Sequence, residues 1–212
     1  MSEKSKDTSH SEVEEKGVSR RAFLKTSGLG AAAATVLSTG VSALPQTGPK
    51  VAGPGAVPIT LRVNGKAMQA QVTPATTLAE ALRGPLNLTG TKVVCDRGAC
   101  SACTVWLDGV PVNSCMTLAI DVGQREVRTI EGLAKGAELH PVQAEFIEHD
   151  AMQCGYCTPG MVMSCAALLE RNPNPSEGDV RDATSGNLCR CGTYPKVFEA
   201  TLAAAGRKGR KA

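Results

Sequence analysis

The sequence predicts an α+β protein in two parts, a strand-rich part over residues 59–134 and a helical part over residues 135–206. Three observations predict this. Apolar residues alternate in the first part, they recur at helical spacing in the second, and each part has its own set of four cysteines. Aromatic residues make up only 3% of the chain, so large rings do not hold the fold together. Disulfides, bound metal or a partner chain are the candidates that could.

The overall charge excludes some classes of function. A formal net charge of +3 is small and gives no electrostatic footprint for nucleic acid. The basic residues in 207–212 are best explained as a solvated tail. No G-x-G-x-x-G motif, P-loop or Ser/His/Asp order stands out, so neither a nucleotide site nor a hydrolase site is indicated.

Residues 1–43 resemble a twin-arginine export signal. Arg20 and Arg21 precede a weakly apolar, Ala- and Gly-rich stretch, and small residues favour cleavage after Ala43. The stretch is short and broken by glycine, so no stable membrane span is expected. We therefore expect export to the periplasm in the folded state, with any cofactor already inserted. Cysteines of exported proteins usually form disulfides. That inference is weaker here, because cysteines that already bind a cofactor during export are not free to pair.

The strand-rich part follows a Pro/Gly-rich linker over residues 44–58. From residue 59 apolar and polar residues alternate, which predicts a strand. The dipeptide Asn64–Gly65 then predicts a tight hairpin turn into a second strand.

One helix and more strands complete this part. Thr77 predicts the start of a short helix over residues 78–83. Asp108–Gly109 predicts the turn of a second hairpin, and residues 125–133 alternate as a further strand.

Four helices are expected in the helical part. They cover residues 140–150, 158–172, 176–185 and 195–206. Val142, Phe146 and Ile147 would form the buried face of the first helix. Thr158, followed by proline, would N-cap the second, and Ser176 begins a capping-box pattern for the third.

The first cysteine set has the spacing C-x4-C-x2-C followed by a fourth cysteine. Its members are Cys95, Cys100, Cys103 and Cys115. This spacing is typical of plant-type [2Fe–2S] ligation. Gly98 allows unusual dihedral angles, and the small side chains of Ala99 and Ala102 let backbone N–H groups approach the sulfurs. A structural zinc site and disulfides are the alternatives.

The second cysteine set pairs a C-x2-C motif with a later C-x-C motif. Its members are Cys154, Cys157, Cys189 and Cys191. Each pair directly precedes a predicted helix, so two helix N-termini would face one anionic cluster. Zinc is a stronger alternative here than at the first set.

Three further residues are expected to have structural or surface positions and not to bind metal. Cys165 lies at core spacing on the second predicted helix and is expected to be a small buried apolar residue. His140 and His149 have no ligand partner at a suitable spacing, so surface or capping positions are expected for them.

Three stretches carry a resemblance to a known family. They are "CDRGACSACTV", "QCGYCTPGMV" and "GNLCRCGTYP". In order and spacing they resemble the signature stretches of the iron–sulfur subunit of molybdenum hydroxylases, the xanthine dehydrogenase and aldehyde oxidase family. The match spans about Ile59 to Ala204. The leader, together with "LHPVQAEFIEHD" and "CRCGTYP", is similar to the exported aldehyde dehydrogenase type within that family.

The resemblance implies a β-grasp ferredoxin domain followed by a four-helix domain, each with one [2Fe–2S] cluster ligated by its cysteine set. It also implies a separate large subunit that binds molybdopterin. Gln153 and Cys191 would approach the pterin. Electrons would pass from the molybdopterin centre through the second set and then the first, to FAD in another subunit or to another acceptor.

Two departures from the family pattern and two rival functions remain. Ser101 stands where the family often has glycine, so a positive φ there would strain the serine unless its hydroxyl donates to a cluster sulfur. "CRCGTY" also replaces the commoner "CRCTGY" order. The rival functions are a free-standing exported ferredoxin-like shuttle and a zinc-binding structural module.

Overall fold

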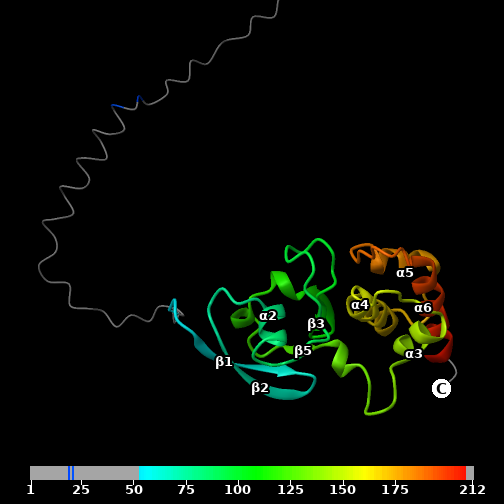
Figure 1. Cartoon of the computed structure of the whole chain (residues 1–212), viewed down its shortest axis with the longest axis horizontal. Helices are drawn as coiled ribbons and strands as arrows, with labels where there is room; N and C mark the ends of the chain where they lie inside the picture. The colour runs from blue at the N-terminus through cyan, green and yellow to red at the C-terminus, as the bar shows by residue number, and fades with distance from the viewer. Residues whose placement is uncertain (1–18, 20, 22–52, 209–212) are drawn as a thin grey trace, which may run out of the picture. The chain divides into compact units, whose positions relative to one another are not determined.

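The computed structural model describes residues 19, 21 and 53–208, and Figure 1 shows how their elements are arranged. The predicted export signal (except Ser19 and Arg21), most of the predicted linker and the end of the basic tail lie outside these residues. None of the helices in the described part combines the length and the apolar character that a membrane span needs.

The first hairpin consists of β1 (Val57–Val63) and β2 (Lys66–Val72), paired antiparallel with Val63 opposite Lys66. Asn64 and Gly65 both have positive φ, 52° and 77°, as a two-residue turn that matches the twist of the strands requires. The predicted hairpin is therefore confirmed. Its inward-facing side chains alternate with exposed ones and begin one side of the core.

The sheet has five strands in the order β2-β1-β5-β3-β4. A second hairpin joins β3 (Thr104–Leu107) to β4 (Val110–Asn113) through Asp108 and Gly109, which also have positive φ. The last strand, β5 (Glu126–Arg128), runs parallel to β1 and antiparallel to β3. The mixed sheet agrees with the predicted β-grasp domain.

Helix α2 (Leu78–Arg83) packs on this sheet. Thr77 caps it in a capping box with Glu80, as the sequence predicts. Leu78 and Leu82 are fully buried in one cluster with sheet residues. The cluster has these buried members: Leu61, Val63, Ala70, Val72, Leu78, Ala81, Leu82, Leu86, Val105, Leu107, Ala119, Val122 and Val127.

The strand predicted over residues 125–133 is wrong beyond Arg128. Residues Ile130–Gly132 form a 3-10 helix instead. The side chain of Asn64 explains the break, because its Oδ1 accepts the backbone N–H of Thr129 at 2.9 Å. A side chain thus occupies the position at which the next ladder hydrogen bond would form.

The helical part contains the four predicted helices, which confirms the fold class. They are α3 (Pro141–Glu148), α4 (Thr158–Arg171), α5 (Glu177–Thr184) and α6 (Tyr194–Lys208). The capping box of Ser176 with Asp179 starts α5 as predicted. Ten residues of α4, Gly160 to Leu169, are buried, so this helix forms the centre of the second core.

Two details of the predicted helices are corrected. Ile147 is 59% exposed, and the buried face of α3 is completed by Glu145, which is only 4% exposed. Ile147 lies five residues after Val142, so the two point about 140° apart around the helix axis. Thr158 is already helical, and Cys157 is the N-cap residue of α4, with its carbonyl accepting the N–H of Met161.

One tryptophan joins the sheet to the helices. The Nε1–H of Trp106, on β3, donates to the carbonyl of Met163 in the middle of α4 at 3.0 Å. The guanidinium of Arg128 lies 5.1 Å from the centre of the same ring, within the range of a cation–π interaction. Trp106 is buried in the core of the helical part. The sheet and the helices therefore pack as one unit.

Candidate functional site

The first cysteine loop curls tightly over residues 95–103. Asp96, Gly98 and Ser101 all have positive φ. At Gly98 an added Cβ would also lie 2.9 Å from the Cγ of Met116, so this position needs glycine for both its dihedral angles and its space. The expectation that Gly98 adopts unusual angles is confirmed.

The four thiols of the first set lie close enough to act on one another. Cys100 contributes to lowering the pKa of Cys95, and Cys103 and Cys95 contribute to raising the pKa of Cys115. Cys115 arrives in a 3-10 helix, Ser114–Met116, directly after β4. The hydroxyl of Ser114 donates to the carbonyl of Cys103 at 2.7 Å and so fixes the fourth cysteine against the loop.

The pKa values of two thiols in the first set are shifted in opposite directions. The backbone N–H of Arg97 is the main cause that lowers the pKa of Cys95 to about 7, assisted by Cys100 and the N–H of Ala99 against an opposing effect of burial. Burial raises the pKa of Cys115 to about 11, and its contact with Cys103 adds to this. Thiolates are the metal-binding form, so metal would release protons from this set on binding.

Ser101, the serine at a position where the family often has glycine, does have a strained positive φ, at 51°. Its carbonyl accepts three hydrogen bonds, from the N–H and the hydroxyl of Thr104 and from the side-chain amide of Asn187. A Cβ added to Gly186 would lie 3.2 Å from the Ser101 hydroxyl. The surrounding contacts hold the strained residue in place.

The second set sits at the starts of two helices. Cys157 is the N-cap residue of α4, and Cys191 lies just before α6. Gly155 and Gly192, each next to a cysteine, have positive φ of 79° and 76°. Free N–H groups and the positive ends of two helix dipoles favour negative charge at such a site.

Two thiols of the second set also form a pair with opposite pKa shifts. Burial is the main cause that raises the pKa of Cys157 to about 12, with smaller contributions from Cys189 and Cys154. Burial also acts to raise the pKa of Cys189, but hydrogen bonds from Thr193, Cys157 and the N–H of Cys191 outweigh it and lower the pKa to about 7. The hydroxyl of Thr193 lies 3.3 Å from the Cys189 sulfur.

This donor set fits a two-iron cluster. Each set supplies four cysteines, and four cysteine thiolates are the usual ligands of a [2Fe–2S] cluster.

The loop that carries Cys189 is held by Tyr194. The phenolic oxygen of Tyr194 accepts the N–H of Cys189 at 2.8 Å, and its O–H donates to the carbonyl of Asn187 at 3.0 Å. Because Tyr194 is the first residue of α6, this side chain fixes the loop to the helix that follows it.

A backbone hydrogen bond joins the two cysteine loops directly. The N–H of Leu188 donates to the carbonyl of Cys100 at 3.1 Å. Beside it, the amide of Asn187 donates to the carbonyl of Ser101 at 3.1 Å. Leu188 precedes Cys189, so one hydrogen bond and a few covalent bonds separate a cysteine of one set from a cysteine of the other. Sequence reasoning missed these contacts, and the only available signal was that Asn187 and Leu188 flank a cysteine motif.

The remaining candidate residues are placed as follows. Gln153 is exposed next to Cys154, which is exposed as well. Cys165 is fully buried, as expected, and burial raises the pKa of its thiol to about 12. His140 caps α3 through its Nδ1, which accepts the N–H of Val142. His149 lies at the other end of α3 and contacts two glutamates.

Two family models match the described part of the chain. Residues 61–128 match a 2Fe-2S iron-sulfur cluster binding domain, and residues 129–202 match a [2Fe-2S] binding domain. Each match contains one complete cysteine set.

Curated relatives and solved structures agree with these matches. The aldehyde oxidoreductase iron-sulfur-binding subunit PaoA of Escherichia coli O157:H7 is 42% identical over 206 residues, covering 89% of each chain. The nicotine 6-hydroxylase small subunit of Paenarthrobacter nicotinovorans is 47% identical over 155 residues, 73% of this chain and 93% of the relative. A crystal structure of quinoline 2-oxidoreductase from Pseudomonas putida 86 superposes with a TM-score of 0.70 at 41% identity, covering 73% of this chain and 97% of the other.

The close approach of α4 to the first cysteine loop depends on Gly160. A Cβ added there would collide with the carbonyl oxygen of Ser101 and would lie 3.0 Å from two backbone atoms of Ala102. We predict that Gly160→Ala lowers the free energy of unfolding by about 1–3 kcal/mol, the usual cost of overpacking. Urea unfolding of the iron-loaded chain measures this.

The matched control is Gly206→Ala, because Gly206 also lies in a helix but has no atom within 4 Å of an added Cβ. Its replacement should be neutral or stabilising by up to about 1 kcal/mol. Equal stabilities of the two variants would show that the loops do not pack as described.

Proposed function

The chain belongs to the iron–sulfur subunits of the xanthine dehydrogenase and aldehyde oxidase family of molybdenum hydroxylases, and we propose which of its residues perform the electron transfer of that subunit. The first [2Fe–2S] cluster is ligated by Cys95, Cys100, Cys103 and Cys115. The second is ligated by Cys154, Cys157, Cys189 and Cys191. A cluster held by each set would supply one-electron transfer, while substrate chemistry takes place on another chain.

The observation that carries this proposal is the hydrogen bond between Leu188 and Cys100. It places the backbone of one cysteine loop against the other without an intervening side chain. Two electron carriers held this way form a relay. A zinc-binding structural module does not require a direct backbone connection between its two metal sites.

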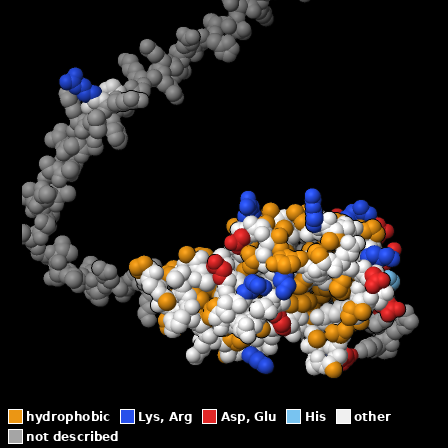
Figure 2. Space-filling view, in the orientation of Figure 1, with side chains coloured by type: hydrophobic (Ala, Val, Ile, Leu, Met, Phe, Trp, Pro, Cys, Tyr) orange, Lys and Arg blue, Asp and Glu red, His pale blue; other side chains and the backbone are white. Residues whose placement is uncertain are grey.

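The large, molybdopterin-binding subunit docks, we infer, at the second cysteine set, where Gln153 and Cys191 approach the pterin. Three large apolar side chains beside this set are exposed: Met152 by 38%, Tyr156 by 54% and Leu188 by 56%. Apolar side chains also reach the surface on the face shown in Figure 2. Exposed apolar groups around a redox centre fit a subunit interface better than a free-standing shuttle.

The first cysteine set faces the acceptor, an FAD-binding subunit or another electron carrier. Val94 and Met116 flank this set and are 57% and 65% exposed. Met116 also contacts Gly98, so the exposed apolar side chain covers the cysteine loop itself. Electrons then pass from the large subunit to the second cluster, to the first cluster and to the acceptor.

Aldehyde oxidation in the periplasm is the proposed setting. The match to the aldehyde oxidoreductase subunit covers 89% of this chain, whereas the match to the nicotine 6-hydroxylase subunit covers 73%. The longer match extends into the region before residue 53. Export in the folded state rests on the twin-arginine pattern around Arg20 and Arg21.

Removal of single cysteines tests the ligand assignment and the relay. In the purified complex, the Cys115→Ala variant is expected to lose half of the iron and one of two rhombic EPR signals after dithionite reduction. The Cys154→Ala variant is expected to lose the other half of the iron and the other signal. With an aldehyde as reductant, Cys115→Ala should still reduce the second cluster, but transfer to the acceptor should fall at least about 100-fold, because the relay is interrupted.

Cys165→Ala is the control, since this cysteine is buried in the core and belongs to neither set. It should keep all of the iron and both signals. Zinc in place of iron, or loss of both signals from either single variant, would contradict the assignment.

Replacing both arginines of the leader tests export. Arg20→Lys combined with Arg21→Lys is expected to leave the iron-loaded chain in the cytoplasm, because the twin-arginine route reads this pair. Fractionation of cells that express the tagged full-length chain measures the distribution. An unchanged periplasmic fraction in the variant, or a cytoplasmic location of the unaltered chain, would disprove the proposed route.

A further inference from the structure

The segment that leads from α3 into the second cysteine set is held rigidly. His149 is the C-cap residue, and Asp150 follows with a positive φ of 48°. The N–H of Asp150 donates to the carbonyl of Ile147 and that of Ala151 to the carbonyl of Phe146, at 3.3 and 2.9 Å. This is a Schellman motif, and the burial of Ala151 completes it. Only Met152 and Gln153 then separate the fixed helix end from Cys154.

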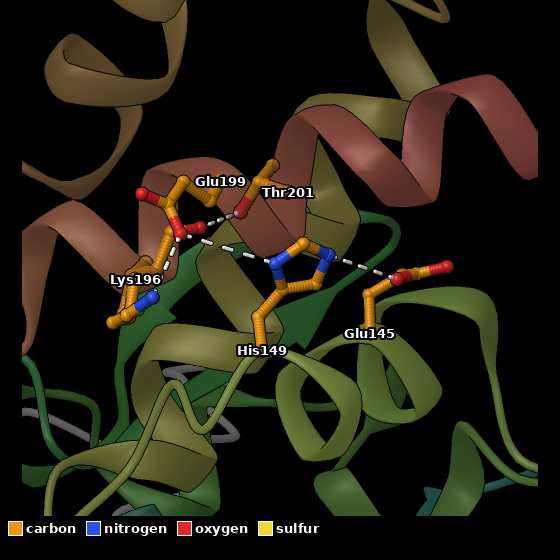
Figure 3. Close-up of polar contacts among 6 residues, drawn as sticks. Glu145, His149, Lys196, Glu199 and Thr201 are labelled. Atoms are coloured by element: carbon orange, nitrogen blue, oxygen red, sulfur yellow. Dashed lines mark hydrogen bonds and ion pairs between the residues drawn. The ribbon is translucent and has the colours of Figure 1, made fainter.

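The imidazole of His149 lies between two carboxylates, as Figure 3 shows. Its Nε2 is 3.3 Å from Glu145, on the same helix, and its Nδ1 is 3.9 Å from Glu199 on α6. The side chain of Glu145 is 5% exposed, that of His149 is 31% exposed and that of Glu199 is 53% exposed. Lys196, one turn before Glu199, also pairs with Glu199 at 3.2 Å.

The second helix in this contact is α6, which follows the Cys189–Cys191 half of the second cysteine set. Helix α6 begins at Tyr194, whose hydroxyl holds the backbone of Cys189. Thr193, directly before it, contacts the sulfur of Cys189. The Glu145–His149–Glu199 chain therefore connects the helix before Cys154 to the helix after Cys191, next to the site that both halves must build together.

We propose that His149 is a positioning residue of the second cluster. It holds the end of α3 against α6 and thereby sets the distance between the Cys154–Cys157 half and the Cys189–Cys191 half of the ligand set. This inference rests on the ligand assignment proposed above. The contact of the imidazole with Glu145 is largely shielded from solvent and so fixes the ring at the end of α3. Residues that orient metal ligands from behind affect metal retention without touching the metal.

The test uses the full-length, iron-loaded chain with His149→Gln, Glu199→Gln and the double variant. Each single variant is expected to broaden or shift the EPR signal of the second cluster and to accelerate release of its iron to a chelator about tenfold. The signal of the first cluster and its iron release should not change. The double variant should be no worse than His149→Gln alone, because that change already removes the contact with Glu199.

Lys196→Gln is the matched control, because it removes the other partner of Glu199 and leaves the imidazole in place. It should behave as the unaltered chain. The inference is overturned if His149→Gln leaves the second signal and its iron release unchanged, or if both clusters change equally. Absence of the second signal from the unaltered chain would instead overturn the proposed ligand assignment, and this inference with it.

Discussion

The hydrogen bond from the N–H of Leu188 to the carbonyl of Cys100 is the contact on which the proposed relay depends. It exists because the sheet and the helices pack closely enough for two loops to touch through their backbones. The Trp106 side chain fixes β3 to α4, and Gly160 leaves room for the carbonyl of Ser101. A larger residue at Gly160 or a loss of the tryptophan contact would act on the relay without altering any cysteine.

Each cysteine set uses backbone donors to prepare for a negative cluster. N–H groups from the tight first loop lower the pKa of Cys95, and the hydroxyl of Thr193 together with N–H groups of the second loop lowers the pKa of Cys189. Burial raises the pKa of Cys115 and of Cys157. Because thiolates are the metal-binding form, binding of iron by these cysteines would release protons.

Local signals in the sequence predicted most of the fold. Turn dipeptides such as Asn64–Gly65 and capping residues such as Ser176 act over a few residues, and the structure confirms both. The failures have a different origin. The end of β5 is decided by the side chain of Asn64 from a distant turn, and Glu145, not Ile147, completes the buried face of α3, in contact with His149. Neither contact leaves a trace in spacing or composition.

In the candidate site, too, local sequence patterns could be predicted and long-range contacts could not. The cysteine spacing predicts two ligand sets, because ligands to one cluster must follow its geometry, and the structure brings cysteines of each set close together. The junction between the loops could not be predicted, since the backbone groups that form it carry no residue-specific signal. Low-temperature EPR of the fully reduced protein tests this junction most directly. Reduced clusters held this close should show magnetic coupling, as splitting or broadening that is absent when only one cluster is reduced. A fully reduced spectrum equal to the sum of two independent signals would contradict the account.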